Sequence, residues 1–241
     1  MYSRRTTHGP VGREVDLAFT DRYGGVSAAP YDELNLAIAG GDDPAACARN
    51  LRLVLDDFAP GDALADLHQV HGADVVVAQG PVDGAPADAL VTDRSGVVLV
   101  VRAADCVPVL LADAEAGVVG AAHCGRPGLV AGVVPATVRA MRDLGARELT
   151  AWVGPHVCGA CYEVPADLQD EVAAAVPATR ATTSWGTPSL DLGAGVRAQL
   201  EEAGAQVVDV AACTRESPDL FSYRRDGAGS GRLAGLIRRA S

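Results

Sequence analysis

The stretch that decides the fold is VVLVVRAADCVPVLLADAEAGVVGAAHC, residues 97–124. Three apolar runs of strand length, at 97–102, 107–112 and 117–122, follow one another so closely that we expect neighbouring strands. A long helix is predicted directly afterwards, because residues 128–144 have a helical period of apolar side chains. The connections between the strands are too short for parallel crossovers, so we expect mixed sheets.

The same alternation of short apolar runs and amphipathic stretches continues outward in both directions, without a tandem repeat. Asp43-Pro44 predicts a helix start, since aspartate caps the backbone and proline fits the first turn. Further strands are expected at 15–20, 64–70, 73–78, 149–153, 207–212 and 233–237, further helices at 166–175 and 195–203, and a Gly/Pro loop at 80–86. No linker interrupts this pattern, so we predict one α/β domain of the α+β type over residues 1–241.

Composition excludes several classes of protein. The 241 residues are 49% hydrophobic and 21% charged, which is typical of a globular domain and not of a disordered chain. The longest apolar runs are too short for a membrane span, and the N-terminus lacks the apolar stretch of a secretory signal. A net charge of -11 argues against binding to duplex nucleic acid. We predict neither a membrane nor a protein partner.

Two residue types narrow the chemistry further. All 20 basic residues are arginine, which excludes a Schiff-base lysine and a phosphate-loop lysine. Six cysteines without a secretory signal are expected to stay reduced, as in the cytoplasm. Only Cys158 and Cys161 have the spacing of a close pair. Because no second CxxC motif accompanies them, we interpret them as small residues near a turn, with a redox pair as the alternative.

Three short motifs place chemically useful residues at predicted strand ends. His68 and His71 alone would fit hydrogen-bonding surface histidines, and Cys106, after Asp105, would fit a buried core thiol. His123 precedes a Gly-bounded turn and the predicted helix, whose N-terminus can hold an anion or can be an ordinary turn. Together, two histidines and one thiol predict a zinc ion with an open fourth position, the pattern of a catalytic site.

Two other metal enzymes do not fit the spacing. A zinc nucleobase deaminase requires His-x-Glu with Pro-Cys-x-x-Cys, and the chain contains neither motif. A multicopper oxidase requires many clustered histidines for several copper ions, and this chain has only five scattered ones.

Ordered motifs along nearly the whole chain resemble one known family. They are FTDRYGGVS (19–27), PY (30–31), LNL (34–36), GDDP (41–44), HQVHG (68–72), ADCVP (104–108), AH (122–123), GP (154–155), CYEV (161–164), LDL (190–192), CT (213–214), FSYRRDG (221–227) and GR (231–232). These motifs are similar to those of the multicopper polyphenol oxidase, or laccase-like, family. Its members are now more often described as purine nucleoside phosphorylases. The resemblance spans roughly residues 15–237.

The resemblance implies a fold of two packed mixed β-sheets flanked by helices. It implies zinc held by His71, Cys106 and His123, with copper as the alternative metal, and phosphorolysis of adenosine, inosine and guanosine. Deamination of adenosine and cleavage of methylthioadenosine are further activities that it implies. The family often has Ala-His-Ala-Gly-Trp-Arg-Gly where this chain has AHCGRPG at 122–128, so Arg126 stands one position earlier than usual.

We predict catalytic roles for the three metal ligands and for Asp105, which could be a general acid, a support for the ligand Cys106, or a turn cap. The predicted phosphate-binding arginines are Arg22 and Arg52, with Arg232 as a second choice, because guanidinium groups bind oxyanions bidentately. Asn35 of the LNL motif is predicted to bind substrate.

Three rival functions remain at this point. Cys106 could be the nucleophile of a cysteine hydrolase with His123 as its base, cleaving an amide such as that of a cell-wall precursor. A copper-dependent phenol oxidase is the second rival, since copper competes well at sites of nitrogen and sulfur donors. The third is a metal-binding or docking module without catalysis.

Overall fold

Two six-stranded mixed sheets divide the apolar centre of the chain between them in the computed structural model, which describes residues 1–240. In spatial order the first sheet contains β1 (Tyr2–His8), β2 (Val15–Thr20), β14 (Leu233–Arg239), β7 (Val97–Ala103), β3 (Ala63–His68) and β5 (Val82–Pro86). The second sheet contains β13 (Gln206–Asp209), β10 (Thr150–Val153), β8 (Val107–Asp113), β9 (Val118–Cys124), β6 (Ala89–Thr92) and β4 (Val75–Val77).

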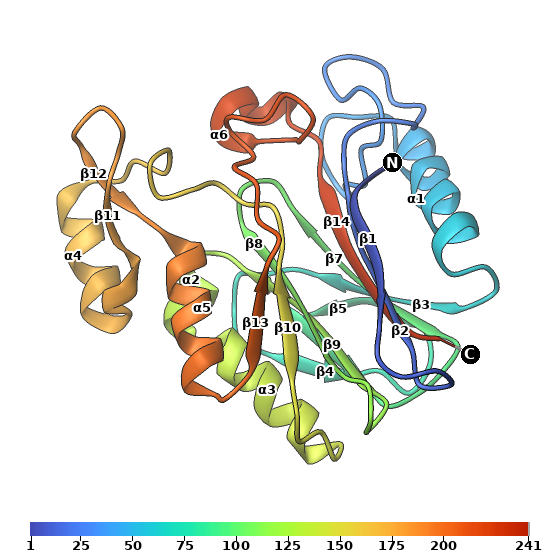
Figure 1. Ribbon diagram of the computed structural model, residues 1–241. Helices are drawn as coiled ribbons and strands as arrows, with labels where there is room; N and C mark the ends of the chain where they lie inside the picture. Colours follow the sequence, from blue (N-terminus) through green and yellow to red (C-terminus); the bar gives the residue numbers. More distant parts are fainter. Residues whose placement is uncertain (241) are drawn as a thin grey trace.

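The remaining elements are helices and one small hairpin. The helices are α1 (Pro44–Phe58), α2 (Arg126–Ala131), α3 (Val133–Asp143), α4 (Ala166–Ala175), α5 (Leu192–Glu202) and α6 (Tyr223–Asp226), with short 3₁₀ turns at Pro177–Thr179 and Gly227–Gly229. The hairpin pairs β11 (Arg180–Thr182) with β12 (Pro188–Leu190). Helix α1 covers the outer face of the first sheet, and α2, α3 and α5 cover the outer face of the second (Figure 1). The predicted fold of two packed mixed sheets flanked by helices is therefore confirmed.

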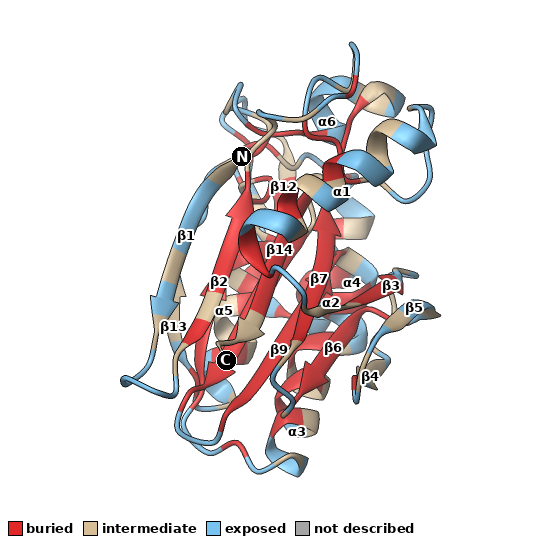
Figure 2. Cartoon of the chain, turned by 90° about the vertical axis from the view of Figure 1, so that its right-hand side faces the viewer, coloured by how far each residue is buried: buried red, intermediate tan, exposed pale blue. Residues whose placement is uncertain are grey.

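Strands β7, β8 and β9 are buried along their entire lengths, as Figure 2 shows for β7 and β9, which explains why their sequences are almost continuously apolar. In β7, Val98 and Val100 face the core beneath α1, whereas Leu99 and Val101 face the second sheet. Alternate side chains point to opposite faces of a strand, so a strand covered on both sides needs apolar residues at every position. The edge strand β1, by contrast, is largely exposed (Figure 2).

The three central strands are not all neighbours, which corrects the expectation from their spacing. Strands β8 and β9 form an antiparallel pair, with Val107 opposite Cys124. Strand β7 lies in the other sheet, between β14 and β3. The chain therefore crosses from one sheet to the other within the three residues Ala104–Cys106. A continuous apolar run indicates burial on both faces of a strand, but it does not reveal which sheet the strand joins.

Other boundaries differ from the sequence prediction for local reasons. The helix expected at 128–144 is two helices, because Gly132 has a left-handed backbone (φ 83°) between α2 and α3. The loop expected at 80–86 contains the edge strand β5, which pairs in parallel with β3. Strand β1 was not expected. The helix start at Asp43 is confirmed, since its side chain accepts a hydrogen bond from the Ala45 backbone at 2.9 Å.

Across residues 1–240, none of the helices combines the length and the apolar character that a bilayer crossing requires.

Candidate active site and metal centre

Two crossings between the sheets build the candidate site. The first crossing, 69–74, joins β3 to β4, and the second, Ala104–Cys106, joins β7 to β8. His71 and Asp105, one in each crossing, have left-handed backbones with φ of 61° and 88°. This conformation is costly for residues other than glycine, and it is often found where a functional side chain is held in place.

The predicted metal ligands His71, Cys106 and His123 are brought together by these crossings and by the end of β9. Their donor atoms all lie within 4.8 Å of one another, and Cys106 Sγ is 3.9 Å from His71 Nε2. The two imidazole rings meet edge to face at 79°, with centroids 4.8 Å apart. His123 is buried and His71 is exposed, so the cluster reaches from the core to the surface.

This donor set fits zinc. Bonds of ~2.0–2.1 Å to nitrogen and ~2.3 Å to sulfur put the donors of a tetrahedral zinc site about 3.3–3.8 Å apart. Small adjustments of the His71 and Cys106 side chains would reach that separation. Three protein donors would leave one position free, which is the arrangement of catalytic zinc sites.

Asp88 organises the cluster, although sequence reasoning did not identify it. Asp88 immediately precedes β6, and its completely buried side chain lies 2.8 Å from Nδ1 of His123. The same carboxylate accepts hydrogen bonds from the backbone N–H groups of His71 and Gly72, at 3.0 and 2.6 Å. Asp88 therefore fixes the backbone of one ligand and turns Nε2 of another toward the cluster. The only sequence signal was an aspartate within an apolar run.

The electrostatics of the cluster favour an ionised thiol. Burial alone would raise the pKa of Cys106, but the neighbouring imidazoles of His123 and His71 lower that pKa to about 6. Burial opposes the charged form of His123, yet the Cys106 thiolate and the Asp88 carboxylate raise the His123 pKa to about 9. Burial would also raise the pKa of Asp88, but His123 and two backbone N–H groups hold it below its ordinary value.

The turn after His123 is closely fitted to the cluster. A Cβ added at Gly125 would lie 2.5 Å from Cδ2 of His71 and 3.2 Å from Sγ of Cys106, so only glycine fits there. Cys124 points away into the apolar core, and burial raises the pKa of its thiol well above the ordinary value. The helix after this turn, α2, has only six residues. It therefore gives less support to the predicted anion site than the long helix that we expected.

Asp105 has a positioning role in this arrangement. One carboxylate oxygen accepts hydrogen bonds from the hydroxyls of Thr214 and Ser222 at 2.6 and 2.7 Å, and the other accepts from the Arg224 backbone N–H at 2.6 Å. Both oxygens are occupied in holding the segment 214–224 against the second crossing. This geometry favours the supporting role among the alternatives predicted for Asp105, because three hydrogen bonds from one segment converge on its carboxylate.

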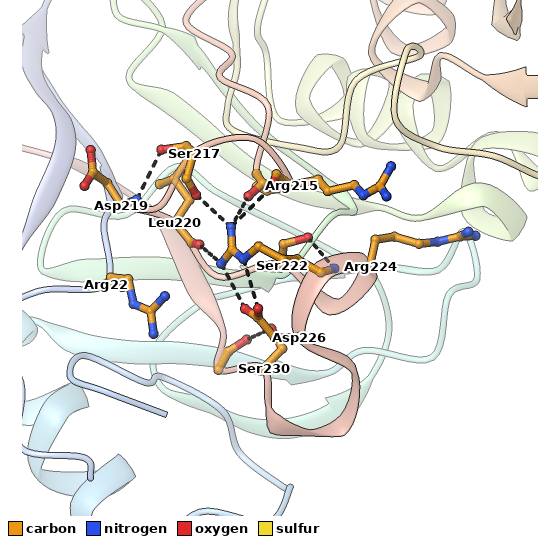
Figure 3. A network of polar contacts seen from close by, with 12 residues as sticks. Arg22, Arg215, Ser217, Asp219, Leu220, Ser222, Arg224, Asp226 and Ser230 are labelled. Carbon is orange, nitrogen blue, oxygen red and sulfur yellow. Dashed lines mark hydrogen bonds and ion pairs between the residues drawn. The ribbon is translucent and has the colours of Figure 1, made fainter. Parts of the chain in front are cut away.

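The segment that Asp105 holds is also fixed from its other side. The carbonyl groups of Ser217 and Leu220 converge on a single guanidinium group, that of Arg225, each at 2.7 Å, and the Arg215 carbonyl lies beside them (Figure 3). Arg225 also pairs with Asp226.

A cavity of about 510 Å³ opens beside the cluster and is the right size for a small-molecule site. Its lining includes all three predicted ligands, the apolar residues Ile38, Leu67 and Leu192, the aromatic residues Tyr162 and Tyr223, and the arginines Arg102, Arg126, Arg224 and Arg232. Arg102 forms a buried ion pair with Asp66. Within the described residues 1–240, the other three arginines form no ion pair with a carboxylate, so their charge is available for an anionic ligand.

The predicted substrate-binding residues are only partly brought to this cavity. Arg232 lines the cavity. Asn35 supports the wall from behind, because its Oδ1 accepts hydrogen bonds from the backbone N–H groups of Ala37 and Arg232 at 3.0 and 2.9 Å. Arg22 lies outside the lining, where its guanidinium group stacks over the ring of Phe221 and forms a hydrogen bond and an ion pair with Asp32. Arg52 lies on the surface of α1 beside a different depression. The sequence indicates the chemistry of these arginines but not the faces that they occupy.

A cavity at the strand ends of two packed sheets, lined by histidine, cysteine and arginine, is typical of enzymes that act on small molecules. The chain belongs to the family described as multi-copper polyphenol oxidoreductase laccase, whose model matches residues 16–240. It is 55% identical to a purine nucleoside phosphorylase of Streptomyces coelicolor, over 92% of this chain and 94% of the relative. It is 56% identical to a purine nucleoside phosphorylase of Streptomyces griseus, over 95% of this chain and 96% of the relative.

The fold is also found in solved structures. A crystal structure of a Neisseria meningitidis protein matches with a TM-score of 0.86 and 34% identity, covering 98% of this chain and 99% of that one. The family resemblance that the sequence motifs indicated is thus confirmed.

Proposed function

We propose that this protein is a zinc-dependent purine nucleoside phosphorylase that acts on adenosine, inosine and guanosine. The observation that carries the proposal is the cavity, in which three unpaired arginines share one space with the Cys/His₂ cluster. The names of the relatives support the same reaction. We place the reaction in the cytoplasm, where the six free cysteines would stay reduced.

The reaction transfers a ribosyl group to phosphate. A phosphate oxygen forms a bond to the anomeric carbon of the ribose, the bond from that carbon to the purine nitrogen breaks, and the base leaves with the bonding electrons and takes up a proton. When bound, zinc supplies Lewis-acid chemistry that lowers the free-energy cost of negative charge on a nearby oxygen. His71, Cys106 and His123 would hold it.

The chain supplies the remaining interactions. Arg126, Arg224 and Arg232 bind the phosphate, because a guanidinium fork matches the oxyanion and keeps its charge at all relevant pH values. Tyr223 and Ile38 give the cavity an apolar and aromatic wall against which a purine ring can pack. Asp105 keeps the wall that carries Arg224 in place. Positioning of two substrates in one cavity accounts for much of the rate of such a bimolecular transfer.

The test is product analysis on the zinc-loaded protein with inosine, adenosine and guanosine, in the presence and absence of phosphate. The expected products are free base and ribose 1-phosphate, formed only with phosphate. Base release that stays at the uncatalysed rate with zinc bound and phosphate in excess would rule out the proposal. Ammonia release from adenosine and base release from methylthioadenosine, measured in the same samples, test the two further activities.

One observation favours a second candidate, a cysteine hydrolase. Cys106 Sγ lies 3.9 Å from Nε2 of His71, a different histidine from the base His123 of the sequence-based hypothesis, and the thiol pKa of about 6 suits a nucleophile. Removal of zinc separates the two functions. A phosphorylase is expected to lose its activity when zinc is removed. A hydrolase would retain or gain amide cleavage after the same treatment. Phenol oxidation that appears only after copper loading would indicate metal exchange at the same donors.

A further inference from the structure

A second cluster of metal-binding side chains lies apart from the cavity. Donor atoms of Cys158, Cys161, Cys213 and Glu216 all lie within 4.8 Å of one another. The first two residues follow β10 and the last two follow β13, and these strands are parallel neighbours. The ends of parallel neighbours emerge at the same edge of a sheet, so the two connections meet there. None of these four side chains takes part in the proposed reaction.

The local backbone has the form of two metal-binding turns. Cys158 and Cys161 have C-x₂-C spacing, and Cys213 and Glu216 repeat that spacing with glutamate in the last position. The backbone N–H groups of Cys161 and Tyr162 donate to the Cys158 carbonyl, each at 3.0 Å, which closes the first turn. The Cys158 backbone N–H donates to Sγ of Cys213 at 3.4 Å, which joins the two turns through a sulfur atom. The second pair is not a CxxC motif, because its last donor is the carboxylate oxygen of Glu216.

Charge at the cluster also favours a bound cation, at a position between core and surface where Cys158 and Cys213 are partly buried and Glu216 is exposed. The Cys161 side chain is 6% exposed, and its thiol donates to the Glu216 carboxylate at 3.3 Å. Within the described residues, Glu216 has no ion pair with any arginine. Three sulfur atoms and one carboxylate therefore share a small volume, and a divalent cation would compensate for their charge when the thiols ionise.

We propose that Cys158, Cys161, Cys213 and Glu216 form a second metal site, which binds a zinc-like divalent cation with four protein donors. Thiolate sulfur selects zinc among the common divalent cations, because magnesium and calcium require oxygen ligands. Four protein donors complete a tetrahedral coordination, so this site is structural and has no open position for a substrate. Binding displaces the thiol protons, and no electron transfer is required.

The site would stabilise one wall of the cavity. Val157 and Tyr162, which flank the first turn, both line that cavity. Thr214, which follows Cys213, donates a hydrogen bond to Asp105 at 2.6 Å. A metal ion would therefore join the two segments that carry this wall, while the His71, Cys106 and His123 donors lie on other connections.

The test is metal stoichiometry of the full-length protein, purified from zinc-supplemented medium under reducing conditions. Two zinc ions per chain are expected in the wild type. One zinc ion per chain is expected in C106A, one in C161S, and none in the double variant. Cobalt loading of C106A should give intense thiolate-to-cobalt charge-transfer absorption from three sulfur donors. C47S is the matched control, because Cys47 is a partly buried thiol outside both clusters, and it should keep two zinc ions.

The milder variant E216Q guards against a variant that fails to fold. It keeps the three thiols and is expected to weaken zinc binding in the C106A background by at least ~10-fold in chelator competition. E202Q, an exposed glutamate on α5, should leave that affinity unchanged. A folded C106A protein without metal would overturn the proposal. Equal zinc affinities of the C106A/E216Q and C106A/E202Q double variants would also overturn it. A disulfide between any two of the three cysteines in the freshly purified protein would also overturn it and would indicate a redox pair.

Discussion

The two clusters of metal-binding side chains are built in opposite ways. The cavity cluster, His71, Cys106 and His123, collects one donor from each of three separate strand ends, and the buried carboxylate of Asp88 orients it. The turn cluster, Cys158, Cys161, Cys213 and Glu216, collects its donors in two closely spaced pairs. Three donors leave a coordination position open, whereas four close it. The difference is one of degree: tertiary structure must place three separate donors at the cavity, whereas at the turn cluster local spacing forms each pair and the pairing of β10 with β13 has only to bring two pairs together.

Replacement of Cys106 by alanine should produce the largest difference between the two clusters, in turnover and in metal content. Turnover of inosine should fall by about 1000-fold, because loss of the metal removes several kcal/mol of charge stabilisation, at ~1.4 kcal/mol per tenfold. Metal analysis should show loss of the cavity metal only. The matched variant C47A should retain turnover and metal content. If C106A retained both, Cys106 would be only a structural thiol.

Thiol reactivity in the metal-stripped protein should distinguish the clusters by about 100-fold at pH 7. The Cys106 pKa of about 6 means that its thiol is largely ionised at neutral pH. Burial and the Glu216 carboxylate raise the Cys161 pKa to about 12, so that thiol stays protonated. The lower intrinsic nucleophilicity of a low-pKa thiolate reduces the ratio from the larger value that ionisation alone would give. Mass spectrometry of peptides alkylated with iodoacetamide measures both rates.

The alkylation rates of Cys106 and Cys161 should also depend differently on pH. Alkylation of Cys106 should reach half its maximal rate near pH 6 and should slow as the pH falls below that value. Alkylation of Cys161 should still be increasing at pH 10. Equal midpoints for the two cysteines would contradict the electrostatic difference between the clusters.

The substitution D88N should lower zinc affinity at the cavity cluster by about 10- to 100-fold, as expected for a group that orients a metal ligand. The amide keeps the shape of the carboxylate but removes the charge that supports His123. Chelator competition measures the affinity, and D83N, an exposed aspartate on β5, is the control. The turn cluster should keep its affinity. A D88N protein with unchanged affinity at both clusters would show that the orientation of His123 does not depend on Asp88.

The smallest expected effect concerns the cavity wall beside the cluster. R126A should raise the KM for phosphate by about 10-fold, since one charge-assisted hydrogen bond contributes ~1.5–3 kcal/mol. R52A, which alters an arginine outside the cavity, should leave it unchanged. Steady-state kinetics with varied phosphate provides the measurement. The reverse result would restore Arg52 as the phosphate ligand and would place the anion away from the cluster.

Much of the fold and of the cavity cluster was predictable because those signals are local. Continuous apolar runs revealed the strands β7, β8 and β9, and their ends identified Cys106 and His123 as candidates. The family motifs then indicated two packed sheets. The helix start at Asp43 followed from a capping residue and a proline.

The remaining features depend on contacts between distant segments, which spacing does not report. Asp88 gains its role only because β6 brings it beside His123 and the 69–74 crossing. Arg22 and Arg52 have the chemistry for phosphate but lie on other faces. Cys213 lies 52 residues beyond Cys161 in sequence, so only the parallel pairing of β10 and β13 could reveal their proximity.

The three-residue crossing Ala104–Cys106 limits how this protein can evolve. Four virtual bonds of the chain, from Ala103 to Val107, reach at most about 14 Å, and packed sheets lie about 10 Å apart. A deletion would pull the sheets together, and an insertion would move the thiol away from both histidines. We therefore expect members of this lineage to keep the length of the crossing together with Asp105 and Cys106, while Ala104 varies, so that conserved spacing would be a mark of descent beside these two residues.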